Sequence, residues 1–151
     1  MTRYLGVDYG RKRIGLAISD GAGITARPLE VVAVADLEEA VARIASDYEI
    51  EGVVVGLPTS LRGYEGDSAE GARELGARIG SLLQVPVVFV DERFTSRIAE
   101  EALLESGMKR RARKETVDKV AAAIILQTYL DTRKTDGNSA EGGGVEPNGS
   151  P

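Results

Sequence analysis

Residues 5–20 read LGVDYGRKRIGLAISD, and this stretch decides the class of fold. Two short apolar segments, Tyr4 to Asp8 and Ile14 to Ser19, flank a basic loop that contains a glycine. This pattern predicts two β-strands joined by a turn. Pro28 to Val34 offers a third strand, so the chain is predicted to open with a three-stranded meander.

Helical and strand-like patterns alternate after this meander. Asp36 to Tyr48 repeats its apolar residues at helical spacing, with Asp36 as the predicted N-cap and Glu39 three residues later. A meander followed by alternating units requires a mixed sheet with helices on both faces, and therefore an α/β fold with a five-stranded sheet. The other predicted elements are strands at Gly52 to Leu57 and Pro86 to Val90, and helices at Asp67 to Leu82, Ser96 to Ser106 and Glu115 to Leu130.

The length and composition fit one folded domain. In a chain of 151 residues, residues 1–131 carry the periodic apolar patterns, and residues 132–151 are rich in Gly, Ser, Asn, Pro and Glu. We expect that tail to be disordered. The longest apolar run, Val120 to Leu126, is far shorter than the roughly 18 residues of a membrane span, and the N-terminus lacks the pattern of a secretion signal. We therefore expect a cytoplasmic protein with no membrane segment.

Neither cysteine nor histidine occurs in the chain. Their absence excludes thiolate and imidazole metal ligands, a cysteine nucleophile and a Ser-His-Asp triad. Chemistry must then use carboxylates, Lys, Arg, Tyr, Ser or Thr. An oxygen-only set of ligands favours Mg²⁺ or Mn²⁺.

The charge is acidic overall but locally basic. A formal net charge of −5 argues against a uniformly basic surface that coats nucleic acid. Either basic run alone is typical of a solvated loop, but together they are candidates for phosphate contacts. The two runs are Arg11, Lys12 and Arg13, and Lys109, Arg110, Arg111, Arg113 and Lys114.

Acidic residues follow two of the predicted strands. Asp8 ends the first strand beside glycines, and Asp91 and Glu92 directly follow the strand that ends at Val90. Open α/β sheets place ligand sites at the carboxyl ends of their strands. The structural alternatives are a turn aspartate at Asp8, a capping role for Asp91 and a surface pair between Glu92 and Arg93.

Asp118 is the most informative acid. It begins a helix that is apolar on almost every side, so its carboxylate carries a desolvation cost unless it is paired or bound to metal. Glu115 lies one turn earlier on the same face. A buried salt bridge is the alternative interpretation for Asp118. Three or four converging acids without histidine suit two-metal phosphoryl chemistry, with two Mg²⁺ or Mn²⁺ ions about 3.5 to 4 Å apart.

The sequence resembles the YqgF family, small bacterial relatives of the RuvC Holliday-junction resolvases that are also described as pre-16S rRNA nucleases. The resemblance covers Tyr4 to Asp131 and rests on residues 5–20, 55–58, 90–93 and 117–122. It implies a ribonuclease H-like fold and a catalytic, metal-binding set of Asp8, Glu92 and Asp118. Asp91, which adjoins Glu92, and Glu115 are further candidates for the metal, and Arg93 joins the basic runs as a nucleic-acid contact.

The resemblance also implies hydrolysis of phosphodiester bonds in structured nucleic acid. Processing of the 5′ end of pre-16S rRNA during ribosome biogenesis, on ribosomal precursor particles, is the first expectation, and resolution of four-way DNA junctions is the second. Whether the chain is a monomer or a homodimer stays open. Two rival classes are a non-catalytic RNA-binding assembly or transcription factor, and an actin-like ATPase or sugar kinase, whose fold needs a second such domain.

Overall fold

The computed structural model describes residues 2–57, 67–91 and 120–133. In this part of the chain five strands form one sheet, in the order β3-β2-β1-β4-β5. β1 and β2 are antiparallel, as are β2 and β3, whereas β4 runs parallel to both β1 and β5. The mixed sheet predicted from the sequence is therefore confirmed. The strands are β1 (Thr2–Asp8), β2 (Arg13–Ser19), β3 (Ala26–Ala33), β4 (Glu49–Leu57) and β5 (Val87–Asp91).

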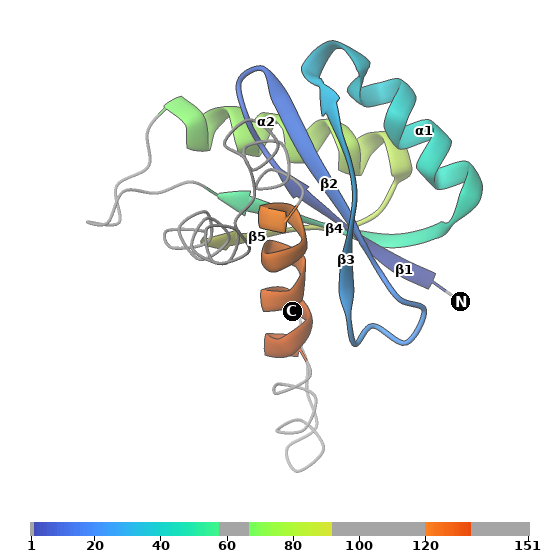
Figure 1. Ribbon diagram of the computed structural model, residues 1–151. Coiled ribbons are helices and arrows are strands. Elements are labelled where there is room, and N and C mark those ends of the chain that lie inside the picture. Colours follow the sequence, from blue (N-terminus) through green and yellow to red (C-terminus); the bar gives the residue numbers. More distant parts are fainter. Residues whose placement is uncertain (1, 58–66, 92–119, 134–151) are drawn as a thin grey trace, which may run out of the picture.

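Helices cover both faces of this sheet, again as predicted. α1 (Leu37–Asp47) and α2 (Asp67–Leu83) lie on one face, and a helix over residues 120–133 lies on the other, where Figure 1 shows it in orange. The predicted helix from Ser96 to Ser106 lies outside the described residues. Within the described ranges, no helix is long and apolar enough to cross a membrane.

The face under α1 and α2 holds the larger core. Residues of the sheet such as Leu5, Val7 and Leu16 are completely buried against α1 and α2. β4 is buried on both of its faces, which explains its continuous apolar run instead of an alternating pattern. Burial of a bulky aliphatic side chain contributes roughly 1.5 to 3 kcal/mol, so this face supplies most of the hydrophobic stabilisation.

The face under the helix of residues 120–133 is built from smaller side chains. A Cβ added to Gly6 of β1 would lie only 2.8 Å from Cβ of Leu126 and 3.0 Å from the carbonyl oxygen of Ala122. The helix can approach β1 this closely because residue 6 has no side chain. Ala17 and Val54 complete the buried patch beneath the helix.

The direction of this helix follows from its contacts with β1. Its C-terminal end meets the start of the strand, where the rings of Tyr4 and Tyr129 are 5.4 Å apart and the guanidinium of Arg133 lies 5.0 Å from the Tyr4 ring centroid. Earlier helix residues meet Gly6, which lies further along the strand. The helix is therefore antiparallel to β1, and its N-terminal end points toward Asp8.

Two details differ from the sequence expectations. Asp36 precedes α1 but makes no capping hydrogen bond through its side chain, because Val34–Asp36 forms a 3-10 turn whose carbonyl at Val34 accepts the N–H of Leu37. The last helix runs to residue 133, beyond the helix end expected at Leu130. Arg133, in this extra length, lies over the Tyr4 ring.

Candidate metal and nucleic-acid site

Asp8 ends the central strand, and both of its neighbours across the sheet are glycines. It is paired with Gly15 of β2 and with Gly56 of β4. Paired residues in a sheet project to the same face, so no side chain stands beside the Asp8 carboxylate on either adjoining strand. Asp8 is half-buried, and its two cross-strand neighbours add no side chain to its surroundings.

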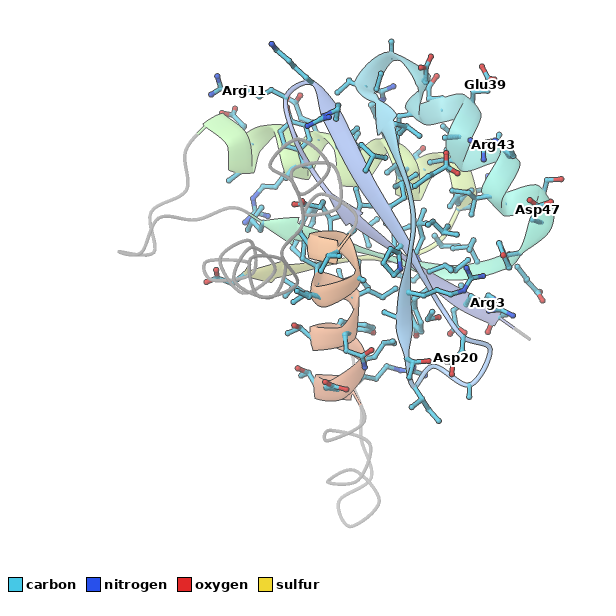
Figure 2. All side chains as sticks on the ribbon, viewed as in Figure 1. Arg3, Arg11, Asp20, Glu39, Arg43 and Asp47 are labelled. Atoms are coloured by element: carbon cyan, nitrogen blue, oxygen red, sulfur yellow. The ribbon has the colours of Figure 1, made fainter. Side chains whose placement is uncertain are left out.

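The chain turns sharply after this strand. A Cβ on Gly10 would collide with the carbonyl oxygen of Arg13, so this turn requires glycine. Arg11 and Lys12 are exposed at the turn and Arg13 is half-buried at the start of β2. Figure 2 shows Arg11 at the tip of this hairpin, at the end of the sheet away from Arg3. Three cations thus follow Asp8 at one end of the sheet.

Asp20, at the opposite end of the sheet, shows what a purely structural acid looks like in this molecule. Its carboxylate accepts hydrogen bonds from the backbone N–H of Ile24, at 2.8 Å, and from Thr25 in the same loop. These bonds, above all the one from Ile24, lower the pKa of Asp20. Asp20 therefore organises its own loop.

Asp91 ends the edge strand β5, but the alternation of the strand separates it from Asp8. Val90 lies in the same row as Asp8, because Gly56 pairs with both, whereas Asp91 pairs with Leu57. Leu57 belongs to the core under α1 and α2, and Val90 packs with the core under the last helix. The exposed Asp91 is therefore on the α2 side of the sheet, and Asp8 is on the side of the last helix.

The remaining predicted site residues lie outside the described residues. Among residues 2–57, 67–91 and 120–133, no group of three or more acidic side chains is close enough together to hold a metal ion. The structure thus describes one member of the predicted catalytic set, Asp8. The residues outside the described ranges are Glu92, Asp118, Glu115, Arg93, Lys109, Arg110, Arg111, Arg113 and Lys114.

Several features of the site were not predicted from the sequence. The glycine neighbours of Asp8 depend on the register between strands, which the sequence does not specify before pairing is known. The close packing of the last helix on Gly6 also joins residues far apart in the sequence, so local patterns do not predict it. Three glycines at positions 71, 76 and 80 of α2 were an available signal, since glycine inside a helix is costly and usually has a packing reason.

Comparison with solved structures defines the class of protein. The fold is similar to RuvC of *T. thermophilus* bound to a Holliday junction, with a TM-score of 0.56 at 19% identity over 89% of this chain and 97% of that one. A fowlpox virus resolvase in complex with junction DNA gives a TM-score of 0.53 at 14% identity, over 87% of this chain and 99% of that one. The fold is the ribonuclease H-like fold expected from the sequence.

Comparison of sequences identifies the family. The family model RuvX, described as Holliday junction resolvase, matches residues 2–132. A relative from *Dictyoglomus thermophilum* is 43% identical over 137 residues, covering 89% of this chain and 99% of its own. A second, from *Clostridium botulinum*, is 43% identical over 132 residues, covering 85% of this chain and 96% of its own. Both carry the name "Putative pre-16S rRNA nuclease".

The chain belongs to the RuvX family, which is the YqgF family of the sequence analysis. The resemblance stated there is confirmed over nearly the whole predicted domain. The family is one of nucleases, hydrolases that cleave ester bonds in nucleic acid.

Proposed function

We propose that this protein is a nuclease dependent on divalent metal ions that processes the 5′ end of pre-16S rRNA. The names of its relatives support the substrate. One structural observation supports the site. Asp8 ends β1 between two glycines, on the face that the last helix covers, and the N-terminal end of that helix points toward Asp8. The actin-like kinase alternative loses its basis, because the family match covers residues 2–132 as a single nuclease domain.

The proposed catalytic and metal-binding set is Asp8, Glu92 and Asp118. Asp8 follows Gly6 by two residues on the same face of β1, which places it about 6.6 Å further along the strand. If the helix continues toward its N-terminus by two residues beyond the described ones, Asp118 would lie one turn before Ala122, at a rise of about 6 Å. Since the helix and the strand are antiparallel and meet at Gly6 and Ala122, these two equal steps in the same direction favour a site shared by Asp8 and Asp118.

The alternation of β5 favours Glu92 over Asp91. Asp91 is on the α2 side, away from Asp8. A carboxylate one residue later is in phase with Val90 and hence with Asp8, if the extended backbone continues by one residue. We therefore propose Glu92 as the ligand and give Asp91 no part in the site. Glu115, one further turn before residue 118 on the helical face, stays a candidate for a fourth carboxylate.

The described residues fit a hard divalent cation. A carboxylate with glycines on both sides offers oxygen ligands and space for water, which suits Mg²⁺ or Mn²⁺. Two such ions would supply activation of water and stabilisation of the charge that develops on the phosphate. The protein's own part is to hold its carboxylates at fixed positions and to orient the phosphodiester.

In this proposal, basic residues bind the phosphates of the substrate. Arg11, Lys12 and Arg13 follow Asp8 on the hairpin, two of them exposed. They are proposed to contact phosphates next to the scissile bond, since phosphate contacts position nucleic acid without reading its sequence. The same role is proposed for Arg93, Lys109, Arg110, Arg111, Arg113 and Lys114.

Resolution of four-way DNA junctions is the second candidate function. The description of the matching family model favours it. A resolvase acting on a symmetric junction needs a homodimer, and rRNA processing on precursor particles in the cytoplasm does not. The oligomeric state on each substrate therefore helps to separate the two candidates.

A side-by-side cleavage assay tests this proposal. The full chain is incubated with a pre-16S rRNA 5′ precursor and with a synthetic four-way junction, in Mg²⁺, in Mn²⁺ and in EDTA. We expect metal-dependent cleavage of the precursor at a higher rate than the junction, and loss of both activities in Asp8→Asn. Faster resolution of the junction would support the second candidate. Cleavage by Asp8→Asn at the wild-type rate would overturn the site.

A further inference from the structure

Tyr9 directly follows Asp8, and its ring packs on the other side of the sheet. The ring contributes to the core beneath α1 and α2. A Cβ added to Gly71 of α2 would lie 2.5 Å from Oη of Tyr9, 2.6 Å from Cζ and 2.9 Å from Cε2. The ring therefore lies directly on the backbone of α2, at a position where any side chain would displace it.

The backbone of α2 is not free to move away from this ring. A Cβ on Gly76 would lie 3.1 Å from the Phe89 ring and 3.2 Å from Cγ2 of Val55, and one on Gly80 would collide with Val87. The helix thus rests on β4 and β5 at two further points along its length. Movement of α2 away from Tyr9 would open these contacts, which favours accommodation of a side chain at position 71 by movement of Tyr9.

The chain on the other side of Tyr9 is equally constrained. Gly10 makes the tight turn against the carbonyl of Arg13, and the N–H of Val34 donates to the carbonyl of Lys12 at 3.2 Å. Displacement of the Tyr9 ring therefore pulls on the end of β1, which is fixed on its other side by this turn. That is where the Asp8 carboxylate is held.

We propose that Tyr9 is a positioning residue, which fixes the Asp8 carboxylate by locking the end of β1 onto α2 at Gly71. This inference rests on the proposed metal site at Asp8. The position of a proposed metal ligand on one face of the sheet would then depend on the packing of one aromatic ring on the opposite face. Displacement of a reacting group by about 1 Å typically lowers a rate by about 100-fold.

The test begins with Gly71→Ala, with Gly80→Ala as its matched control. Both add one methyl group to the same helix at a tight contact, but Gly80 contacts Val87 at the start of β5, whereas Gly71 contacts Tyr9, the residue after Asp8. We expect Gly71→Ala to lower kcat by roughly 10- to 100-fold and to raise the Mg²⁺ concentration needed for half-maximal cleavage, with KM for the RNA little changed. Gly80→Ala should lower the melting temperature without moving the Mg²⁺ requirement. Equal effects of the two variants on that requirement would overturn the proposal.

Tyr9→Leu provides a double-mutant test that does not depend on the folding of Gly71→Ala alone. Leucine lacks atoms equivalent to Cε2, Cζ and Oη, which are the atoms that a residue-71 methyl group would strike. Tyr9→Leu should itself raise the Mg²⁺ requirement, and adding Gly71→Ala to it should raise the requirement no further. Tyr9→Phe keeps the ring on Gly71 and should restore wild-type behaviour. Additive effects, or a loss in Tyr9→Phe as large as in Tyr9→Leu, would contradict positioning by the ring.

A readout without substrate separates this inference from the proposed function. Thermal melts in EDTA and in Mg²⁺ measure binding of the metal alone. Loss of the Mg²⁺-induced shift in Asp8→Asn, together with a reduced shift in Gly71→Ala and Tyr9→Leu, supports both proposals. Loss in Asp8→Asn with full shifts in the other two would overturn the role of Tyr9 and leave the metal site standing. A full shift in Asp8→Asn would overturn the metal site itself.

Discussion

The two faces of the sheet differ in the size of the side chains that they bury. Under α1 and α2, bulky residues such as Leu5, Val7 and Leu16 are fully buried. Under the last helix, Gly6 and small neighbours allow a close approach, and the row beyond Gly6 holds a carboxylate between glycines. One face thus holds most of the bulky buried side chains, while the other carries Asp8 and the proposed site.

This division has an energetic reason. Carboxylates held near one another without a metal repel, which costs part of the stability of the fold. Natural domains are stable by only about 5 to 15 kcal/mol, so that cost must be offset by burial elsewhere. For the proposed site, the large core under α1 and α2 would offset that cost.

Leu16→Ala is expected to have the largest effect on stability. Leu16 is completely buried on the α1 and α2 face, and its truncation leaves a cavity. We expect the free energy of unfolding to fall by roughly 2 to 5 kcal/mol. The cleavage rate per folded molecule should stay near the wild-type value, because Leu16 lies on the face opposite the Asp8 carboxylate and is not part of the contact between Tyr9 and Gly71. Denaturant titration and cleavage below the transition check both parts.

On the other face, Gly6→Ala should lower the cleavage rate more than Leu16→Ala does and the stability less. The new methyl group would press on Cβ of Leu126 and on the backbone at Ala122, neither of which is a flexible chain end. Stability should fall by roughly 1 to 3 kcal/mol, less than in Leu16→Ala, whereas the cleavage rate should fall by roughly 10- to 100-fold because the helix is displaced. If Leu16→Ala costs as much activity per folded molecule as Gly6→Ala, the two faces do not divide these tasks.

The exposed cations of the β1–β2 hairpin should have a smaller effect, on the salt dependence of nucleic-acid binding. The double variant Arg11→Gln and Lys12→Gln removes two exposed cations at the hairpin tip, and we expect the slope of log affinity against log salt to fall by about 0.7 to 0.9 per lost phosphate contact. Arg43→Gln with Arg78→Gln is the control, since these cations pair with Glu30 and Glu38 on the α1 and α2 side. A change of slope in the control equal to that in the test would show that net charge alone matters.

The sequence was sufficient for the order of the described elements and for the place of Asp8 at the end of a strand. Short-range patterns predicted each described strand, because the short apolar segments of β1, β2 and β4 consist of consecutive residues that are buried on both faces of the sheet. Asp8 could be singled out because it ends a strand beside a glycine turn.

The surroundings of Asp8 could not be predicted in the same way. Its pairing with Gly15 and Gly56, and the contact of Tyr9 with Gly71, join residues far apart in the chain through the register of the strands and the seat of α2. Local patterns carry no information on such contacts. The choice between Asp91 and Glu92 was open for the same reason, since the phase of β5 relative to β1 depends on β4 between them.

The central claim is that the face of the last helix carries a metal site shared by Asp8 and Asp118, and melting of Asp118→Asn in EDTA and in Mg²⁺ tests it most directly. The substitution relieves repulsion at nearly constant volume, so the metal-free variant should be at least as stable as the wild type. Mg²⁺ should raise the melting temperature of the wild type by mass action and that of the variant much less. A buried salt bridge at Asp118 predicts the reverse, because removing one partner strands a cation at a cost of about 3 to 5 kcal/mol. Strong destabilisation of the metal-free variant, with an undiminished Mg²⁺ shift, would contradict the shared site.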